Sequence, residues 1–210
     1  MQDKVVVLYA ARHGTTDLNA QDCFRGLKDV SLDKAGFRDA NKLAELFEPI
    51  EISFIVYSDR KRTTQTAEII AERKDMKDYT QATESLRAWN VGKFSGQPKN
   101  EENVAAVEWY VANPDEVIPQ GESLNAFKHR VRPAIIDAVK ASNHIGEPGL
   151  IVAHSSIIHE ISSMFHGDHE MELVDPGGAV AIFFDPKEGL KSEAVFKPRP
   201  NPKSSADTVS

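Results

Sequence analysis

Short apolar segments that alternate with helix-like segments constrain the fold of this chain more than any other feature of its sequence. The first, VVVLYAA at 5–11, is rich in Val and Leu and short, as a strand buried on both faces is. The other strand-like segments are ISFIVYS at 52–58, GLIVA at 149–153, AVAIFF at 179–184 and AVF at 194–196. Because helical patterns separate them, the sequence predicts a three-layer α/β/α fold with a mostly parallel central sheet.

The helical patterns begin at residues that are typical helix caps. Asp33 precedes an amphipathic stretch at 35–47, and Asp59 precedes a second one at 62–72. Ser123 precedes a long helix that carries an apolar face of Phe127, Val131, Ile135 and Val139. A further helix is expected at 157–165. Residues 97–120 interrupt the alternation, so we expect them to form an excursion over one face.

Length and composition restrict the class of protein. A chain of 210 residues suits one domain, which we expect at 1–197, and the Pro-, Ser- and Asn-rich residues 198–210 are expected to form a loose tail. The formal net charge of −7 disfavours binding to nucleic acid or to an anionic membrane surface. One cysteine, Cys23, excludes an internal disulfide and fits the cytoplasm. The sequence predicts no membrane span, metal site or cofactor, and leaves the oligomeric state open.

Polar residues follow three of the predicted strands where each strand ends. Arg12 and His13 follow the first strand, Arg62 opens the helix after the second, and His154 follows the third. The carboxyl ends of parallel strands share one edge of the sheet, where ligands of open α/β folds bind. We therefore expect two histidines and two arginines to converge there, together with helix N-termini that present free N–H groups.

Two histidines and two arginines at one point suit phosphoryl transfer. A neutral imidazole is a nucleophile near neutral pH and can hold the phosphoryl group as phosphohistidine. Guanidinium groups bind the nonbridging oxygens and offset the charge that spreads over them in the transition state. This scheme needs no metal ion, and its partner is a small phosphorylated substrate.

The chain resembles the histidine phosphatase superfamily, also called the phosphoglycerate mutase-like family. The resemblance runs in order from residue 4 to 184 through ARHGTTDLN, FRGLKDVSLDKAGFRDANKLAELF, SDRKRTTQTAEII, LRAWNVGKFSG, GESLNAF and LIVAHSS. It implies a phosphoglycerate mutase-like fold. It also implies that His13 is the nucleophile, and that Arg12, Arg62 and His154 complete the phosphate site.

Further residues are expected to contact the substrate, and the resemblance suggests two of them, Asn19 and Ser155. Asn19 stands where many members place a polar contact near the phosphate. Ser155 stands where relatives often have Gly, with its backbone N–H facing the site. Arg87, in LRAWNVGKFSG, is expected to line the substrate entrance. Phe24 and Arg25 are expected on the opposite rim.

One position departs from the family pattern. Family phosphatases usually read Leu-Arg-Glu where this chain reads Leu86-Arg87-Ala88, and that Glu is their general acid. Three accounts are open. Glu122 serves as the acid, with Glu84 a weaker candidate; or the substrate has a leaving group that needs little help; or the protein binds phosphate without catalysis.

The sequence therefore predicts a phosphatase that acts on a phosphomonoester or related phosphoryl compound through a phosphohistidine at His13. Two alternatives stay open. One is a phosphoglycerate mutase-type phosphotransferase, and the other is a noncatalytic phosphate-binding regulatory module.

Overall fold

A computed structural model of the chain describes residues 5–165, 174–185 and 189–196. Its centre is a six-stranded sheet with the strand order β3-β2-β4-β1-β5-β6. The strands are β1 (Val5–Arg12), β2 (Ile55–Ser58), β3 (Thr80–Thr83), β4 (Gly149–Ala153), β5 (Ala179–Asp185) and β6 (Gly189–Phe196). The expected tail at 198–210 lies outside the described residues.

The sheet is mixed, with its parallel part on one side. β4 pairs in parallel with β1 and with β2, and β2 pairs in parallel with β3. β5 runs antiparallel to β1 and β6 antiparallel to β5. The predicted α/β fold is confirmed, with the antiparallel pair β5–β6 added at one edge. Only a short connection joins β5 to β6, and antiparallel neighbours can be joined in that way.

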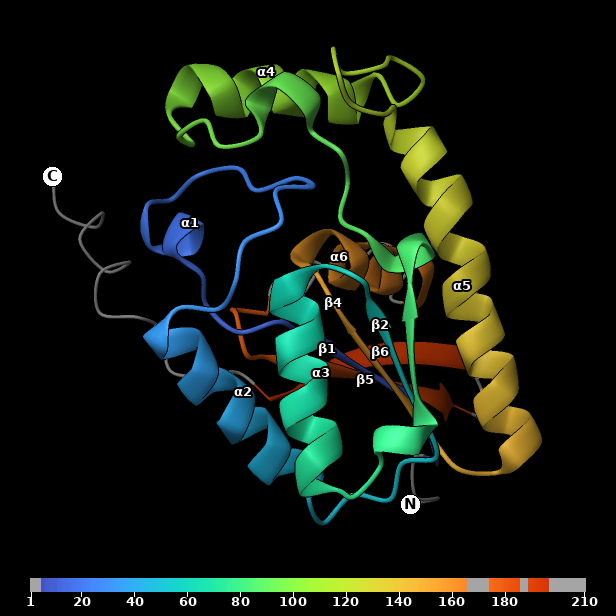
Figure 1. Cartoon of the computed structure of the whole chain (residues 1–210). Coiled ribbons are helices and arrows are strands. Elements are labelled where there is room, and N and C mark those ends of the chain that lie inside the picture. The colour runs from blue at the N-terminus through green and yellow to red at the C-terminus, as the bar shows by residue number, and fades with distance from the viewer. Residues whose placement is uncertain (1–4, 166–173, 186–188, 197–210) are drawn as a thin grey trace, which may run out of the picture.

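Helices cover both faces of the sheet. The helices are α1 (Asp17–Ala20), α2 (Lys34–Phe47), α3 (Lys61–Arg73), α4 (Glu101–Ala112), α5 (Leu124–Ile145) and α6 (Ser155–Phe165). Figure 1 shows α2 and α3 side by side in front of the sheet, and these two helices pack on one core with Leu150 and Val152. α5 and α6 pack on a second core with Ile151 and Ala153. β4 is thus buried on both faces, as its all-apolar sequence predicts.

The segment at 97–120 forms the expected excursion. It carries α4, which lies at the top of Figure 1, apart from the two helical layers on the sheet. β3 was not expected, because its sequence TQAT has no apolar alternation and none of its residues is fully buried. β3 lies at the edge of the sheet and pairs with β2 on one side. This pairing, rather than the sequence pattern of TQAT, makes it a strand.

Two of the three predicted helix caps are present. Asp33 accepts a hydrogen bond from the Gly36 N–H at 2.7 Å, and the Ser123 hydroxyl accepts one from the Ala126 N–H at 3.1 Å. The prediction for Asp59 was wrong. Arg60 precedes α3 and makes no side-chain cap, while the Asp59 carboxylate binds arginines. Among the described helices, none is long and apolar enough to cross a membrane.

Candidate active site

Three adjacent parallel strands bring the predicted residues together. β2, β4 and β1 are neighbours in the sheet, and they end at Ser58, Ala153 and Arg12. His13 and His154 follow two of these ends directly, and their rings lie 5.4 Å apart between centroids. Arg62, in the first turn of α3, reaches the same point and is 1% exposed. Arg12, His13, Arg62 and His154, together with Arg25 described below, are called the basic cluster here.

The contacts of His13 define which ring nitrogen carries its proton. Nδ1 lies 2.7 Å from the Gly14 carbonyl oxygen, which can only accept, so Nδ1 carries the hydrogen. Nε2 accepts a hydrogen bond from the Nε of Arg62 at 3.2 Å, so it carries the lone pair. Burial, and then the positive charge of Arg62, lower the pKa of His13 well below its ordinary value of 6.5. A neutral imidazole whose Nε2 is unprotonated can act as a nucleophile.

Arg62 is held by backbone carbonyl groups and not by a carboxylate. Its two terminal nitrogens donate to the Lys28 oxygen at 2.7 Å and the Gly26 oxygen at 3.2 Å. Burial, followed by repulsion from Arg25, lowers the pKa of Arg62 to about 9. Its positive charge is therefore poorly compensated inside the protein, and an anion would stabilise it.

Two buried polar atoms in the basic cluster have no protein partner. They are Nε of Arg12 and Nδ1 of His154, and no other described side-chain atom shares this condition. One terminal nitrogen of Arg12 donates to the Val174 oxygen at 2.7 Å, and Nε2 of His154 lies 2.9 Å from the Ser58 hydroxyl. Buried polar atoms are nearly always paired, so unpaired ones at one place indicate a ligand with several acceptor oxygens.

Arg25 belongs to the basic cluster although the sequence indicated no more than a rim contact. Its charge lowers the pKa of Arg12, Arg62, His13 and His154, and burial lowers its own pKa. The segment that carries Arg25 is tied to α3, because Asp29 accepts from the Lys61 N–H and the Leu32 N–H donates to Gln65. No sequence pattern around Arg25 marked this contact, which only the folding of 24–32 over α3 creates.

Close backbone packing positions the turn that carries His13. A Cβ atom on Gly14 would lie 2.3 Å from the Gly36 oxygen, and one on Gly36 would lie 2.0 Å from the Thr15 oxygen. Asp39 on α2 accepts hydrogen bonds from the Thr15 N–H at 3.1 Å and from its hydroxyl at 2.6 Å. Both positions need glycine for this approach. The turn is thereby fixed against α2, and His13 with it.

Asn19 and Ser155 both lie in the first turn of a helix, and Ser155 directly follows His154. The Asn19 side-chain oxygen accepts from the N–H and the hydroxyl of Thr16, which caps the short helix α1. Ser155 is the first residue of α6, directly after His154, so its N–H is among those that the helix leaves unpaired. Their contacts with phosphate stay predictions.

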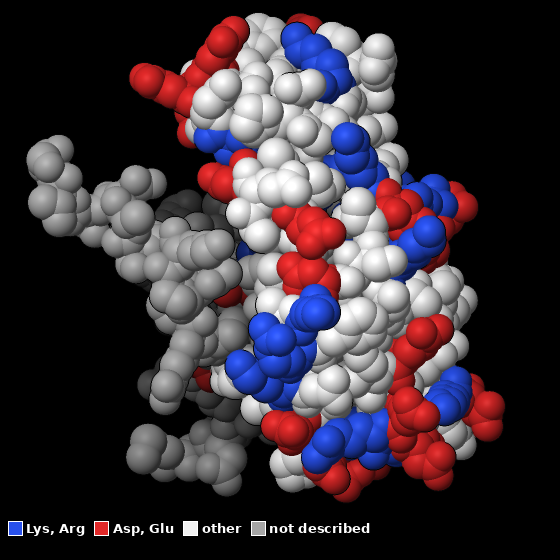
Figure 2. Space-filling view, turned by 60° about the vertical axis from the view of Figure 1, so that its left-hand side comes forward, with Lys and Arg blue, Asp and Glu red and all other residues white. Residues whose placement is uncertain are grey.

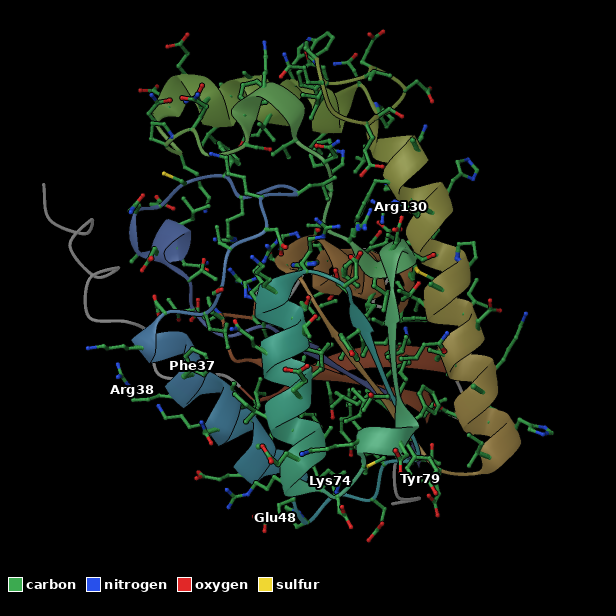
Figure 3. All side chains as sticks on the ribbon, viewed as in Figure 1. Phe37, Arg38, Glu48, Lys74, Tyr79 and Arg130 are labelled. Atoms are coloured by element: carbon green, nitrogen blue, oxygen red, sulfur yellow. The ribbon has the colours of Figure 1, made fainter. Side chains whose placement is uncertain are left out.

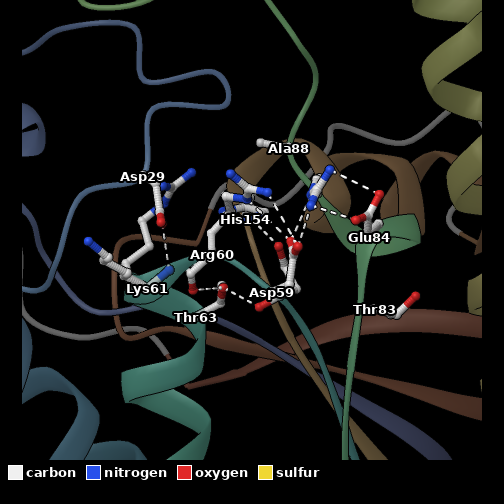
Figure 4. A network of polar contacts seen from close by, with 12 residues as sticks. Asp29, Asp59, Arg60, Lys61, Thr63, Thr83, Glu84, Ala88 and His154 are labelled. Carbon is white, nitrogen blue, oxygen red and sulfur yellow. Dashed lines mark hydrogen bonds and ion pairs between the residues drawn. The ribbon is translucent and has the colours of Figure 1, made fainter.

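Arg87 lies in an ion-pair network beside the basic cluster (Figure 4). Its guanidinium binds both carboxylate oxygens of Asp59 and lies 2.9 Å from a carboxylate oxygen of Glu84. Asp59 also accepts from Arg60 at 3.2 Å, and the hydrogen bonds from Arg87 are the main reason that its pKa falls to about 2. These four residues are called the ion-pair network here. The predicted contact of Arg87 with substrate stays a prediction, and its guanidinium is already bound.

Glu122 is likewise engaged as an acceptor. Its carboxylate lies 2.7 Å from Arg130 and accepts from the Asn90 N–H at 2.9 Å. Arg130, labelled on α5 in Figure 3, also donates to the carbonyl groups of Ser85 and Arg87. The pair thus braces the segment at 84–90. These contacts use Glu122 as an anion, so they do not favour its role as acid.

One face of the molecule carries mixed charge (Figure 2). On the face that Figure 2 shows, acidic and basic side chains form interspersed groups. Arg62 is 1% exposed, so most of its charge acts inside the fold and does not form a basic surface. Within the part of the chain that the structure describes, no group of three or more His, Cys, Asp or Glu residues is arranged to hold a metal ion.

Comparison with known proteins places the chain in a family. The sequence profile of the histidine phosphatase superfamily (branch 1) matches residues 8–177, so the chain belongs to that superfamily. Relatives include the probable phosphoglycerate mutases GpmB of Proteus mirabilis and Klebsiella pneumoniae, which are 32% and 31% identical over 151 residues. Each alignment covers 70% of this chain and 68% of the relative.

Solved structures share the fold at lower identity. A phosphoglycerate mutase from Bacillus anthracis superposes with a TM-score of 0.76 at 22% identity, over 93% of this chain and 95% of that one. A mycobacterial glucosyl-3-phosphoglycerate phosphatase superposes with a TM-score of 0.72 at 22% identity, over 90% and 96%. A putative alpha-ribazole-5'-P phosphatase from Escherichia coli superposes with a TM-score of 0.72 at 21% identity, over 91% of this chain and 96% of that one. The phosphoglycerate mutase-like fold of the chain is confirmed.

Proposed function

We propose that the protein is a phosphatase that hydrolyses a small phosphorylated compound through a phosphohistidine on His13, and that it acts in the cytoplasm. The observation that carries this proposal is the pair of unpartnered buried atoms, Arg12 Nε and His154 Nδ1, beside a neutral His13. A phosphoryl group offers three oxygens to such donors and a phosphorus atom to the nucleophile.

The reaction has two steps. The Nε2 lone pair of His13 attacks phosphorus, the bond from phosphorus to the leaving atom breaks, and its electron pair departs with the leaving group. Water then attacks the phosphohistidine, the P–N bond breaks, and its electron pair returns to Nε2 while a proton goes to solvent. The Gly14 carbonyl keeps the proton on Nδ1 throughout, so His13 leaves as neutral imidazole. Arg12, Arg62 and His154 hold the nonbridging oxygens in both steps.

Substitution of the nucleophile tests the proposal. We expect His13→Ala to lower kcat by a factor on the order of 10⁶, as removal of an essential nucleophile does. The variant should also lose the acid-labile phosphoenzyme that the unmodified chain forms with ³²P-labelled substrate. The exposed His144, in the last turn of α5, supplies a matched control as His144→Ala. Full turnover by His13→Ala would refute the mechanism.

A mutase is the second candidate, and the 32% identity to probable phosphoglycerate mutases favours it. A mutase transfers the phosphoryl group of the phosphohistidine to an alcohol and not to water. Transfer between phosphoglycerates, followed with and without a bisphosphoglycerate primer, separates the two activities. Phosphate binding by calorimetry with no turnover of any substrate would instead favour a noncatalytic binding module.

A further inference from the structure

Expulsion of an alkoxide needs a proton at the leaving oxygen, and a positioned acid typically contributes a factor of about 10² to 10⁴. Three carboxyl groups near the basic cluster bind arginine side chains. Asp59 and Glu84 bind Arg87, and Glu122 binds Arg130. The charges of Asp22, Asp29 and Asp175 raise the pKa of Arg25, Arg62 and Arg12 respectively, while Asp22 pairs with Lys99 and Asp29 accepts from the Lys61 N–H.

The ion pairs hold three of these carboxylates, Asp59, Glu84 and Glu122, against arginine side chains. A carboxylate that binds a guanidinium must lose that ion pair before it can hold a proton. Asp59 is the extreme case, because its two oxygens both face Arg87 and its pKa falls to about 2. Asp59, Glu84 and Glu122 are therefore engaged with arginine side chains and do not face a leaving group as free acids.

The imidazole groups do not supply the proton either. Burial lowers the pKa of His154 well below 6.5, and the charge of Arg62 lowers it further. His13 is the nucleophile, and its proton is held by the Gly14 oxygen. Neutral imidazole is a far weaker acid than a carboxylic acid.

Ala88 occupies the position at which the family resemblance implies a general acid. Its neighbour Trp89 donates its N–H to the Ser156 hydroxyl at 3.2 Å, and Ser156 stands two residues after His154. Ala88 is 8% exposed, and Figure 4 shows it next to His154 and the ion-pair network. A methyl group thus stands where a carboxylic acid could reach a leaving group.

We propose that this site acts on phosphoryl compounds whose leaving group departs as a stable anion without taking a proton, such as acyl phosphates and activated aryl phosphates, and discriminates against alkyl monoesters. The inference rests on the proposed phosphatase function. In the first step the P–O bond breaks and its electron pair stays on the carboxylate or aryl oxide, so no proton is transferred. The basic cluster needs only to offset the charge on the phosphoryl oxygens.

The dependence of rate on the leaving group tests this directly in the unmodified protein. We would measure kcat/KM, which reports phosphoenzyme formation, for acetyl phosphate, 4-nitrophenyl phosphate, phenyl phosphate and glycerol phosphate. We expect a steep fall along this series, by at least a factor of about 10² to 10⁴ between the activated compounds and glycerol phosphate. If glycerol phosphate and 4-nitrophenyl phosphate react within tenfold of each other, the proposal is overturned.

A carboxylic acid introduced at position 88 gives a second test. Ala88→Glu should raise kcat/KM for glycerol phosphate by about 10² to 10⁴ while changing that for acetyl phosphate only a few-fold. The matched control is Ala88→Gln, whose side chain has the size of Glu but no acidic proton. In this variant kcat/KM should still fall steeply from acetyl phosphate to glycerol phosphate. Equal gains from Glu and Gln would count against the proposal. If thermal unfolding shows that a variant at the buried position 88 does not fold, the kcat/KM values of the unmodified protein for the four compounds decide the test by themselves.

The phosphoenzyme separates this inference from the function on which it rests. A chain that forms no phosphohistidine on His13 with any of the four compounds contradicts the proposed function. A chain that forms it equally fast from glycerol phosphate and acetyl phosphate keeps the proposed function and contradicts the substrate class.

Discussion

Arg62 and Arg60 stand two residues apart, yet one belongs to the basic cluster and the other to the ion-pair network. Arg60 binds the Asp59 carboxylate, whereas Arg62 binds the carbonyl groups of Gly26 and Lys28 and the His13 ring. The ion-pair network is charge-compensated and therefore suited to hold loops in place. The described residues show no ion pair between a carboxylate and a member of the basic cluster, and His13, Arg62 and His154 are buried, which is costly unless an anion joins them. Both groups contain arginines, so the residue type does not distinguish them. What distinguishes the ion-pair network from the proposed binding site is that its arginines are paired with carboxylates.

Removal of Arg62 should have the largest effect after that of His13. Arg62→Leu keeps an apolar side chain at this buried position but removes one of the groups proposed to offset charge in the transition state. We expect a loss of about 3 to 4 kcal/mol in transition-state stabilisation, which lowers kcat/KM by about 10² to 10³. Arg73→Met, at the other end of α3, is the control, because Arg73 is 39% exposed and binds Glu48. A change of less than threefold in Arg62→Leu would show that the uncompensated charge serves no catalytic purpose.

Arg25 should have a smaller effect that appears mainly in binding. It acts on the other members of the basic cluster through charge, and no contact with His13 holds it. We expect Arg25→Met to weaken inhibition by inorganic phosphate about tenfold, which corresponds to about 1.4 kcal/mol. The exposed Arg38, on α2 in Figure 3, provides the control as Arg38→Met. An unchanged inhibition constant would place Arg25 outside the binding site.

The ion-pair network should affect stability more than activity, and in a pH-dependent way. The pKa of Asp59 in the folded chain, about 2, lies below its ordinary value of 3.8, so ionised Asp59 stabilises the fold. This contribution is complete above 3.8 and is lost as the pH falls toward 2. We expect Asp59→Asn to cost up to about 2 kcal/mol of unfolding free energy at neutral pH.

Urea unfolding of the unmodified chain and of Asp59→Asn, from neutral pH down to about 2, measures the difference between their free energies of unfolding. This difference in unfolding free energy should shrink as the pH falls from about 4 to about 2. At neutral pH, kcat/KM of Asp59→Asn for acetyl phosphate should stay within a few-fold of that of the unmodified chain. A difference that stays constant with pH would mean that charge on Asp59 is not what stabilises the segment.

Most of the framework could be predicted from the sequence because its signals are local. The apolar runs at β1, β2 and β4 follow from burial on both faces, and Asp33 and Ser123 begin α2 and α5 as caps do. β3 could not be predicted, since TQAT has neither apolar alternation nor β-branched continuity and depends on its pairing with β2. The antiparallel direction of β5 and β6 has no local signal either.

Some residues of the candidate site could likewise be predicted from the sequence, and others could not. The convergence of His13, Arg62 and His154 follows from strand order, since helical connections between parallel strands bring their carboxyl ends to one edge. Arg25 could not be assigned, because its place depends on how the 24–32 segment folds over α3. The engagement of Arg87 with Asp59 could not be predicted either, because the two residues are 28 positions apart and lie on different loops.

The sequence by itself determined which chemical groups stand at the ends of the strands, and also that position 88 carries a methyl group and no acid. Those facts are local, and no folding changes them. Only the tertiary structure decided which charges are compensated, because an ion pair depends on side chains from separate segments meeting within a few ångströms. The same amino acid, arginine, therefore braces a loop at position 87 and is left to bind an anion at position 62.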